Sequence, residues 1–140
     1  MRAIDFSQDD AVVSTLGQLG GGALVPADIL YADLTGDRRE EAVVPISSQG
    51  TLGNIAYLVF TMVDGEPTPV LRRTLDRGSA AGGLVMAVAD GTLIETAGEF
   101  GPEDPFCCPS FLRRTYFRWD GTALQVEREE RLANPIQPKR

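Results

Sequence analysis

The chain has 140 residues, of which 43% are hydrophobic and 24% are charged, and its formal net charge is −7. This length and composition fit one globular domain that buries a core without help from metals or disulfides. The negative charge argues against general binding to nucleic acids or to acidic membrane surfaces, since both are polyanionic.

The N-terminal segment predicts the one helix of the fold. A helix-compatible run follows Ser7 and continues to about Leu19. We expect Ser7 to be the N-cap, with Asp9 and Asp10 favoured by the positive end of the helix dipole. The glycine run 20–22 then ends the helix.

Two short strands and three hairpins are predicted after the helix. Three Asp-Gly dipeptides lie between runs with strand character, and Asp-Gly favours type I′ turns because these need positive φ at both central residues. The strands and hairpins cover residues 29–33, 42–46, 55–75, 83–97 and 112–131. The expected fold class is therefore α+β, mostly β: an antiparallel sheet of successive hairpins with one N-terminal helix. We expect a single globular domain over 1–134 and a frayed tail at 135–140.

Within these hairpins, residue patterns predict the place of individual strands. The strand over 83–89 is apolar on both faces, which favours a central position. Pro67 and Pro69 lack N–H donors, so their strand is expected at a sheet edge.

The last hairpin also predicts a register. With a two-residue loop at Asp120-Gly121, Phe117 faces Leu124, and Arg114 lies near Glu127 on the exposed face. The buried face is predicted to hold Phe117, Trp119, Leu124 and Val126.

Oxygen-bearing side chains alternate along the polar loop that joins the first two strands, at Asp33, Thr35, Asp37 and Glu41. In calcium loops such alternation directs several oxygens at one hard cation. The spacing resembles the cation loops of FG-GAP-type repeats and, less closely, of EF-hands, although Thr35 replaces the usual carboxylate or Asn and Arg38 replaces the usual Gly. The alternative is a loop without a cofactor, in which Asp and Thr side chains cap their own backbone.

Cys107 and Cys108 are the only cysteines, and they are adjacent. This spacing does not fit metal or thioredoxin-like sites, which need patterns such as C-x-x-C. Two interpretations remain. One is a strained vicinal disulfide with a distorted or cis peptide bond, favoured if the protein is exported. The other is a pair of thiols packed as small apolar residues.

The loop around the cysteines carries three prolines and three acids. Glu99, Glu103 and Asp104 are candidates for binding a cation or a basic partner. The alternative is that they form a solvated rim.

The chain contains no histidine. This excludes Ser-His-Asp and Cys-His catalysis and zinc sites that use histidine. Neither a P-loop nor a dinucleotide-binding glycine pattern is present. We therefore expect that the protein is not an enzyme.

Five short motifs together resemble a known family. They are YADLTGD at 31–37, EEAVV at 40–44, GNIAY at 53–57, DPFCCPS at 104–110 and TYFRW at 115–119. The chain resembles, over roughly residues 28 to 127, the LppP/LprE-type bacterial lipoproteins and related uncharacterised secreted proteins. The resemblance implies export to the cell envelope. It also implies a lipid-attachment cysteine near the mature N-terminus, which Met1–Asp10 does not contain.

Two locations stay open at this point. Met1–Asp10 carries three acids and lacks the apolar segment of a signal peptide, so the protein is either cytoplasmic or begins after a removed export signal. Given the family resemblance we expect an extracytoplasmic protein. No segment is long and apolar enough to be a transmembrane helix.

The leading functional hypothesis is a non-enzymatic cell-envelope or secreted domain that binds or scaffolds a small ligand or an envelope protein. One alternative is a redox- or metal-responsive protein that uses Cys107 and Cys108. Another is a calcium-stabilised, adhesion-like module.

Overall fold

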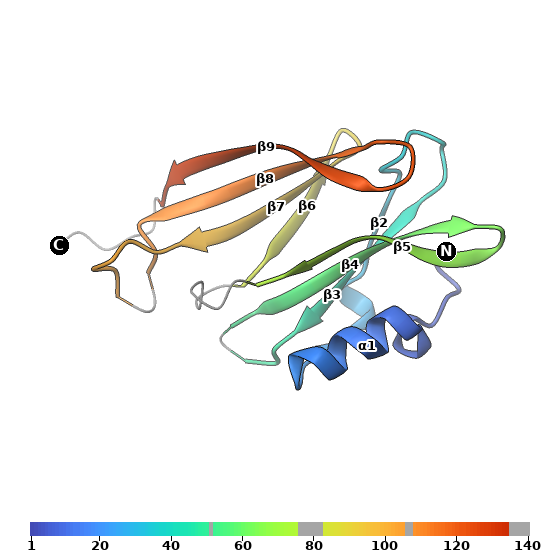
Figure 1. Cartoon of the computed structure of the whole chain (residues 1–140), viewed down its shortest axis with the longest axis horizontal. Helices are drawn as coiled ribbons and strands as arrows, with labels where there is room; N and C mark the ends of the chain where they lie inside the picture. The colour runs from blue at the N-terminus through green and yellow to red at the C-terminus, as the bar shows by residue number, and fades with distance from the viewer. Residues whose placement is uncertain (51, 76–82, 106–107, 135–140) are drawn as a thin grey trace.

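Nine strands and one α-helix stack in three layers within the residues that the computed structural model describes, which are 1–50, 52–75, 83–105 and 108–134 (Figure 1). The N-terminal sheet has the order β1-β3-β4-β5, with β2 also paired to β3, and the C-terminal sheet has the order β6-β7-β8-β9. All of these pairings are antiparallel, which confirms the predicted mostly β fold with one helix near the N-terminus. The elements are α1 (Asp10–Leu19), β1 (Ala23–Leu24), β2 (Leu30–Ala32), β3 (Glu41–Ser47), β4 (Asn54–Val63), β5 (Glu66–Thr74), β6 (Val85–Ala89), β7 (Thr92–Glu99), β8 (Phe111–Trp119) and β9 (Leu124–Ala133).

The N-terminal sheet is the middle layer, so its central strands β3 and β4 are buried on both faces. Val43 and Val59 join the core between the two sheets. Val44 and Phe60 point to the other face, where they pack with residues of α1 and with Phe6. Because side chains alternate between faces, these two strands supply both cores.

The helix begins two residues later than predicted, because Asp9 and not Ser7 is its N-cap. The Asp9 carboxylate accepts the backbone N–H of Ala11 at 2.8 Å. Residues Phe6–Gln8 form a separate 3₁₀ turn, whose own cap is Asp5. The helix ends as expected at Gly20, which adopts φ 72° and donates its N–H to Leu16.

Two of the three Asp-Gly turns are tight, as predicted. Asp64 and Gly65 have φ of 51° and 81°, and Asp90 and Gly91 have φ of 51° and 75°. In both turns the flanking residues pair directly across the hairpin. The strand with the two prolines, β5, lies at the edge of its sheet, which was also predicted.

The third Asp-Gly turn is wider than predicted. Asp120 accepts the N–H groups of Thr122 and Ala123 at 2.8 Å, so the loop is longer than two residues and Trp119 pairs with Leu124. Near the turn the register moves by two residues, and an even shift leaves every side chain on its predicted face. Phe117 therefore keeps its buried position. A bulge at Tyr116/Phe117 moves the remaining pairs by one more residue.

The shifted register overturns two details of the predicted hairpin. Arg114 pairs with Glu130, not with Glu127. Val126 is 48% exposed, because β9 is the edge strand of its sheet and nothing described covers this position. Phe117 and Leu124 are buried and Trp119 is half-buried, as expected of the inner face.

The predicted central position of the strand over 83–89 is wrong. Its described part, β6, is an edge strand of the C-terminal sheet, and Val85 is 57% exposed. The outer face of this sheet carries no further layer among the described residues, so its apolar side chains at this edge stay in contact with solvent.

Among the described residues, the one α-helix is ten residues long, and no helix there has the length and apolar character needed to cross a bilayer. The predicted tail at 135–140 lies outside the described residues.

Candidate functional site

The loop that connects β2 to β3, here called the Asp33 loop (residues 33–41), closes on its own hydrogen bonds. Asp33 accepts the backbone N–H groups of Thr35 at 3.1 Å, Gly36 at 2.8 Å and Arg38 at 2.8 Å. Partial loss of solvation favours the protonated form of Asp33, but the backbone N–H groups together outweigh it and hold the pKa of this carboxyl below its usual value. The sequence thus places a carboxylate where it organises the turn.

Arg38 occupies the left-handed region with φ 68°. Calcium loops usually have Gly at the equivalent place, because a Gly backbone adopts this conformation without strain. Arg38 therefore adopts the φ that Gly usually provides at this place, even though the residue differs.

Glu41 anchors the far end of the Asp33 loop from inside the sheet. Its side chain is 1% exposed, and its oxygens accept the backbone N–H of Leu34 at 2.8 Å and the hydroxyl of Thr61 at 3.0 Å. Burial raises the pKa of Glu41, these two hydrogen bonds act in the opposite direction, and the charges of Asp37 and Asp33 add to the rise.

The structure brings three of the four predicted calcium ligands together. Ligand oxygens of Asp33, Asp37 and Glu41 all lie within 4.8 Å of one another. Thr35 is held against Asp33, with its hydroxyl 3.5 Å from the carboxylate. Because most of these oxygens already accept hydrogen bonds from the protein, the loop geometry is explained without an ion, and calcium binding stays a prediction.

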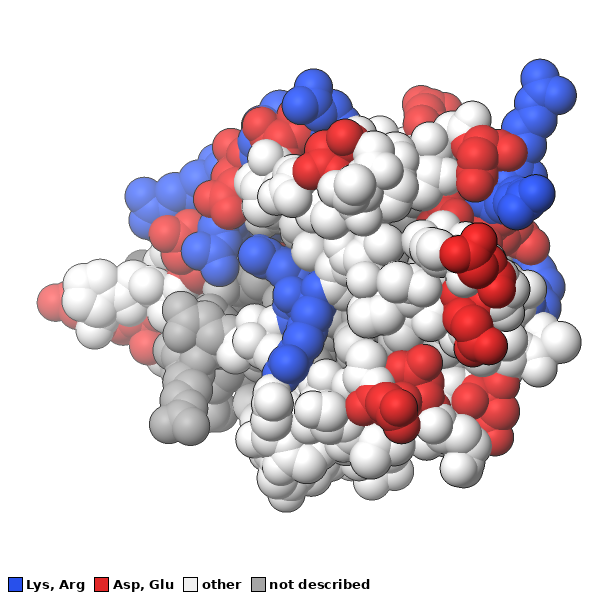
Figure 2. Space-filling view, turned by 45° about the vertical axis from the view of Figure 1, so that its right-hand side comes forward, with Lys and Arg blue, Asp and Glu red and all other residues white. Residues whose placement is uncertain are grey.

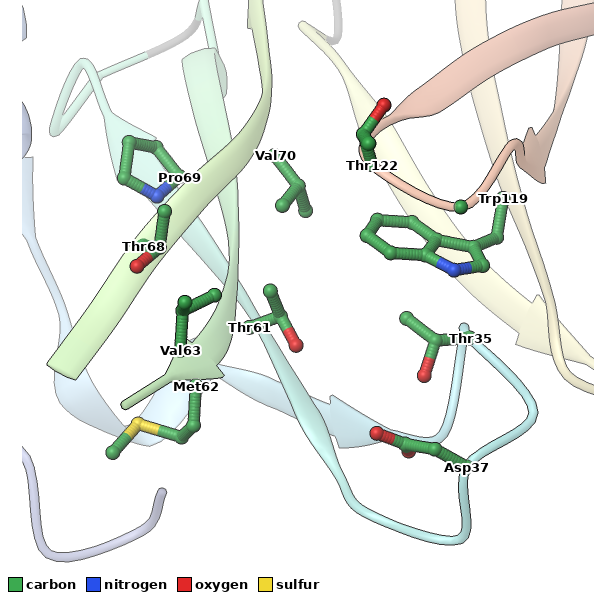
Figure 3. A pocket seen from close by; sticks show the side chains of 11 residues that line it. Thr35, Asp37, Thr61, Met62, Val63, Thr68, Pro69, Val70, Trp119 and Thr122 are labelled. Carbon is green, nitrogen blue, oxygen red and sulfur yellow. The ribbon is translucent and has the colours of Figure 1, made fainter. Parts of the chain in front are cut away.

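Beside the Asp33 loop, a cleft opens between the two sheets, and we call it the Trp119 cleft (Figure 3). Its volume is about 400 Å³. Figure 3 shows Trp119 on one side, side chains of β4 and β5 on the other, and Thr35 and Asp37 from the loop at one end. The lining residues are Thr35, Asp37, Thr61, Met62, Val63, Thr68, Pro69, Val70, Trp119, Gly121 and Thr122.

The position of Trp119 follows from the turn after β8. The indole is half-buried and packs against the core between the sheets. The wide turn held by Asp120 places Gly121 and Thr122 beside it at the mouth of the cleft. Aromatic faces at a cleft are a common means of holding a small ligand.

A buried set of polar side chains, which the sequence did not predict, connects the two sheets by hydrogen bonds. Glu95 of β7 is 1% exposed and accepts the hydroxyl of Tyr57 at 2.8 Å and the guanidinium of Arg73 at 2.9 and 3.2 Å. Burial, followed by the nearby Glu95 charge, raises the pKa of Tyr57. The sequence feature that could have indicated this site is a glutamate in the same inward-facing alternation as Leu93 and Ala97 along the strand.

The three acids of the predicted binding loop lie in different surroundings. Asp104 accepts the N–H groups of Gly101 at 2.5 Å and Ser110 at 2.7 Å. Glu99 lies 3.4 Å from Arg131 in a surface ion pair. Glu103 is exposed. These contacts favour a structural role for Glu99 and Asp104 over a common binding site.

Cys107 lies outside the described residues, so the predicted bond between Cys107 and Cys108 and the peptide geometry between them stay predictions. The backbone carbonyl of Pro105 accepts the backbone N–H of Cys108 at 2.9 Å.

Comparison of the chain with family models, with curated proteins and with solved structures finds no match.

Proposed function

We propose that this protein is a non-enzymatic binding domain that holds a small ligand in the Trp119 cleft. The observation that supports the proposal is the composition of the cleft, which is lined by one aromatic ring, several apolar side chains, four hydroxyl groups and one carboxylate. Mixed clefts of this size, with a few convergent polar groups, are the usual form of small-molecule sites.

The arrangement of carboxylates supports binding rather than catalysis. Acid–base catalysis by paired carboxylates needs two groups that both reach the substrate. Asp37 lines the cleft, but Glu41 does not, because it is buried in β3 behind the hydroxyl of Thr61. One accessible carboxylate suits recognition of a ligand better than a two-step proton transfer.

The location of this binding domain is a second part of the proposal. The resemblance to LppP/LprE-type lipoproteins supports a place in the cell envelope or outside the cell. In that setting a ligand reaches the cleft from the extracytoplasmic space.

The proposal is tested by nuclear magnetic resonance on the full chain in the presence of a chelator. The protein is titrated with small fragments of four classes: cations, anions, neutral sugars and apolar aromatics. At least one class is expected to shift the indole N–H signal of Trp119 and the amide signals of Thr68 and Thr122 in a saturable way. A separate surface depression is lined by Arg38, Asp64 and neighbouring residues. Shifts that map only to that depression, or no saturable shift for any class, would contradict a binding role for the cleft.

A further inference from the structure

The hydroxyl groups of the Trp119 cleft present oxygen lone pairs, not protons, to a ligand. Each of the four threonine hydroxyls in the lining has an acceptor of the protein itself within 3.5 Å, and the contacts of Thr61 and Thr122 are the shorter ones. The donor–acceptor pairs are Thr35 to Asp33 at 3.5 Å, Thr61 to Glu41 at 3.0 Å, Thr68 to the Glu66 carbonyl at 3.3 Å and Thr122 to Asp120 at 3.0 Å. A hydroxyl whose proton is used in this way can only accept a further hydrogen bond.

The remaining polar side chains of the cleft add to this bias. Asp37 is a carboxylate and therefore an acceptor, and Figure 3 shows it at the loop end of the cleft. The indole N–H of Trp119 is the one side-chain donor among the described lining residues. A ligand rich in hydrogen-bond donors fits such a cleft, whereas a ligand that also needs donors, such as a sugar, finds few.

The charges around the cleft also favour a cation. No basic residue is among the described lining residues, and Arg38 and Arg39 line a separate depression with Met1 and Gly65. Figure 2 shows basic side chains interleaved with acidic ones at the upper left of the molecule, over the C-terminal sheet. The net charge of −7 adds a field that attracts cations and repels anions.

The aromatic wall gives such a cation a face to contact. A guanidinium or ammonium group over an indole is attracted by the negative face of the ring, and a planar guanidinium also stacks on it. Asp37 at the end of the cleft supplies an acceptor for its N–H groups. The apolar side chain of Val70 on the opposite wall suits an aliphatic stem (Figure 3).

From these observations we propose that the ligand of the Trp119 cleft is an organic cation with N–H donors on an aliphatic stem, either a free guanidinium or amine or the side chain of arginine or lysine in a protein. The inference rests on the proposed binding function and names its ligand class. Three features carry it together: a surface of acceptors, an aromatic face and the absence of basic side chains from the described lining.

Trp119 is the only tryptophan of the chain, so intrinsic fluorescence reports on the cleft directly. The full chain in chelator is titrated with n-butylguanidinium and with n-butylurea, which has nearly the same shape but no charge. We expect a saturable change with n-butylguanidinium, and affinity for n-butylurea lower by about tenfold or more, since a charge-assisted hydrogen bond contributes on the order of 1.5–3 kcal/mol.

Two variants separate the cleft from the overall charge. Asp37→Asn removes the carboxylate of the cleft and should weaken n-butylguanidinium binding by about tenfold. Asp10→Asn removes the same charge from an exposed position of α1, in another layer, and should change the affinity by less than about twofold. Equal loss in both variants would mean that only the net charge acts, and would overturn the inference.

The two sources of the cation are distinguished by a third probe, N-acetyl-arginine methylamide. Binding of this probe tighter than n-butylguanidinium supports a protein side chain as the ligand, and weaker binding supports a free cation. If n-butylguanidinium gives no response while another fragment class occupies the cleft in the magnetic resonance titration, the inference is wrong and the proposed function stands. If no class occupies the cleft, both are wrong.

Discussion

Glu41 is a carboxylate in a strand that is otherwise apolar, and its protonation is coupled to folding. Because burial raises the pKa of Glu41 in the folded state, folding favours its protonated form. The corresponding stability is fully present below the unfolded pKa of a glutamate, about 4.3, and is lost as the pH rises through the folded pKa.

The variant Glu41→Gln lacks this titration. Its amide oxygen still accepts the N–H of Leu34, and its amide NH₂ replaces the carboxylate oxygen at Thr61, whose hydroxyl then accepts instead of donating. We therefore expect the free energy of unfolding of the wild type, relative to Glu41→Gln, to fall from pH 4 to pH 8. Urea denaturation in chelator at several pH values measures this difference. A difference that instead grows with pH would show that the folded protein stabilises the anion.

The Asp33 loop is the expected place of any calcium ion. Calorimetric titration of calcium into chelator-treated protein should give a binding heat that disappears in Asp37→Ala and persists in Asp10→Asn. Asp37 is one of the three clustered carboxylates of the loop, whereas Asp10 lies in α1. Heat that persists unchanged in Asp37→Ala would place the ion elsewhere. No heat in the wild type would leave the loop as one that its own hydrogen bonds organise.

At the scale of single elements, substitutions before α1 test whether Asp9 or Ser7 is the N-cap of the helix. Asp9→Ala removes the side-chain acceptor for Ala11 and Val12 and should destabilise the protein by about 1 kcal/mol. Ser7→Ala is the matched control and should cost only a few tenths of a kcal/mol, as expected for exposed surface positions. Chemical denaturation of both variants decides between them, and a larger loss in Ser7→Ala would restore the cap predicted from the sequence.

The hairpin of β8 and β9 tests the corrected register. Phe117 is 3% exposed and Val126 is 48% exposed, although the sequence pattern placed both on the buried face. Phe117→Ala should cost about 3 kcal/mol or more, whereas Val126→Ala should cost less than about 1 kcal/mol. Similar losses for the two variants, measured by urea denaturation, would support the original register.

Local chemistry explains which elements could be predicted from the sequence. The turns at Asp64-Gly65 and Asp90-Gly91 were predictable because positive φ at both residues is a property of the dipeptide itself. At Asp120 the same dipeptide gives a wider turn, since the carboxylate accepts two backbone N–H groups further along the chain. A choice between two local hydrogen-bond patterns is not visible in the dipeptide.

The parts that could not be predicted depend on contacts between distant segments. By contrast, the sequence could predict that Asp33, Asp37 and Glu41 lie close together, because all three belong to one loop. The Trp119 cleft joins that loop to β4, β5 and the turn after β8, so no local pattern marks it. The edge position of β6 likewise depends on which strands pair, not on its apolar composition.

At the scale of the whole molecule, the two sheets are joined by a buried polar group as well as by the apolar core. Tyr57 and Arg73 come from the N-terminal sheet, and Glu95 comes from the C-terminal sheet. The Glu95 side chain is 2% exposed and that of Arg73 is 30% exposed, so the ion pair is largely shielded from water. Removal of one partner then leaves a buried charge or hydroxyl without its hydrogen bond.

We predict that Glu95→Ala destabilises the protein by about 3 kcal/mol or more, because it leaves both Tyr57 and Arg73 without their acceptor. Glu95→Gln should cost less, since the amide oxygen still accepts one of these hydrogen bonds while the charge is lost. Urea denaturation of the two variants gives the order. A Gln variant no more stable than the Ala variant would mean that charge alone, and not hydrogen bonding, accounts for the contribution.

A double-mutant cycle of Glu95→Ala and Arg73→Ala measures how much the interaction of these two side chains contributes to holding the sheets together. The coupling free energy of this pair should be about 1–3 kcal/mol, as for residues in one buried network. The surface pair of Glu99 and Arg131, whose side chains are 38% and 58% exposed, is the matched control, and its coupling should be below about 1 kcal/mol. Since the control pair lies within the C-terminal sheet, a coupling at Glu95 and Arg73 no larger than this would mean that packing of the apolar core, and not the polar group, holds the two sheets together.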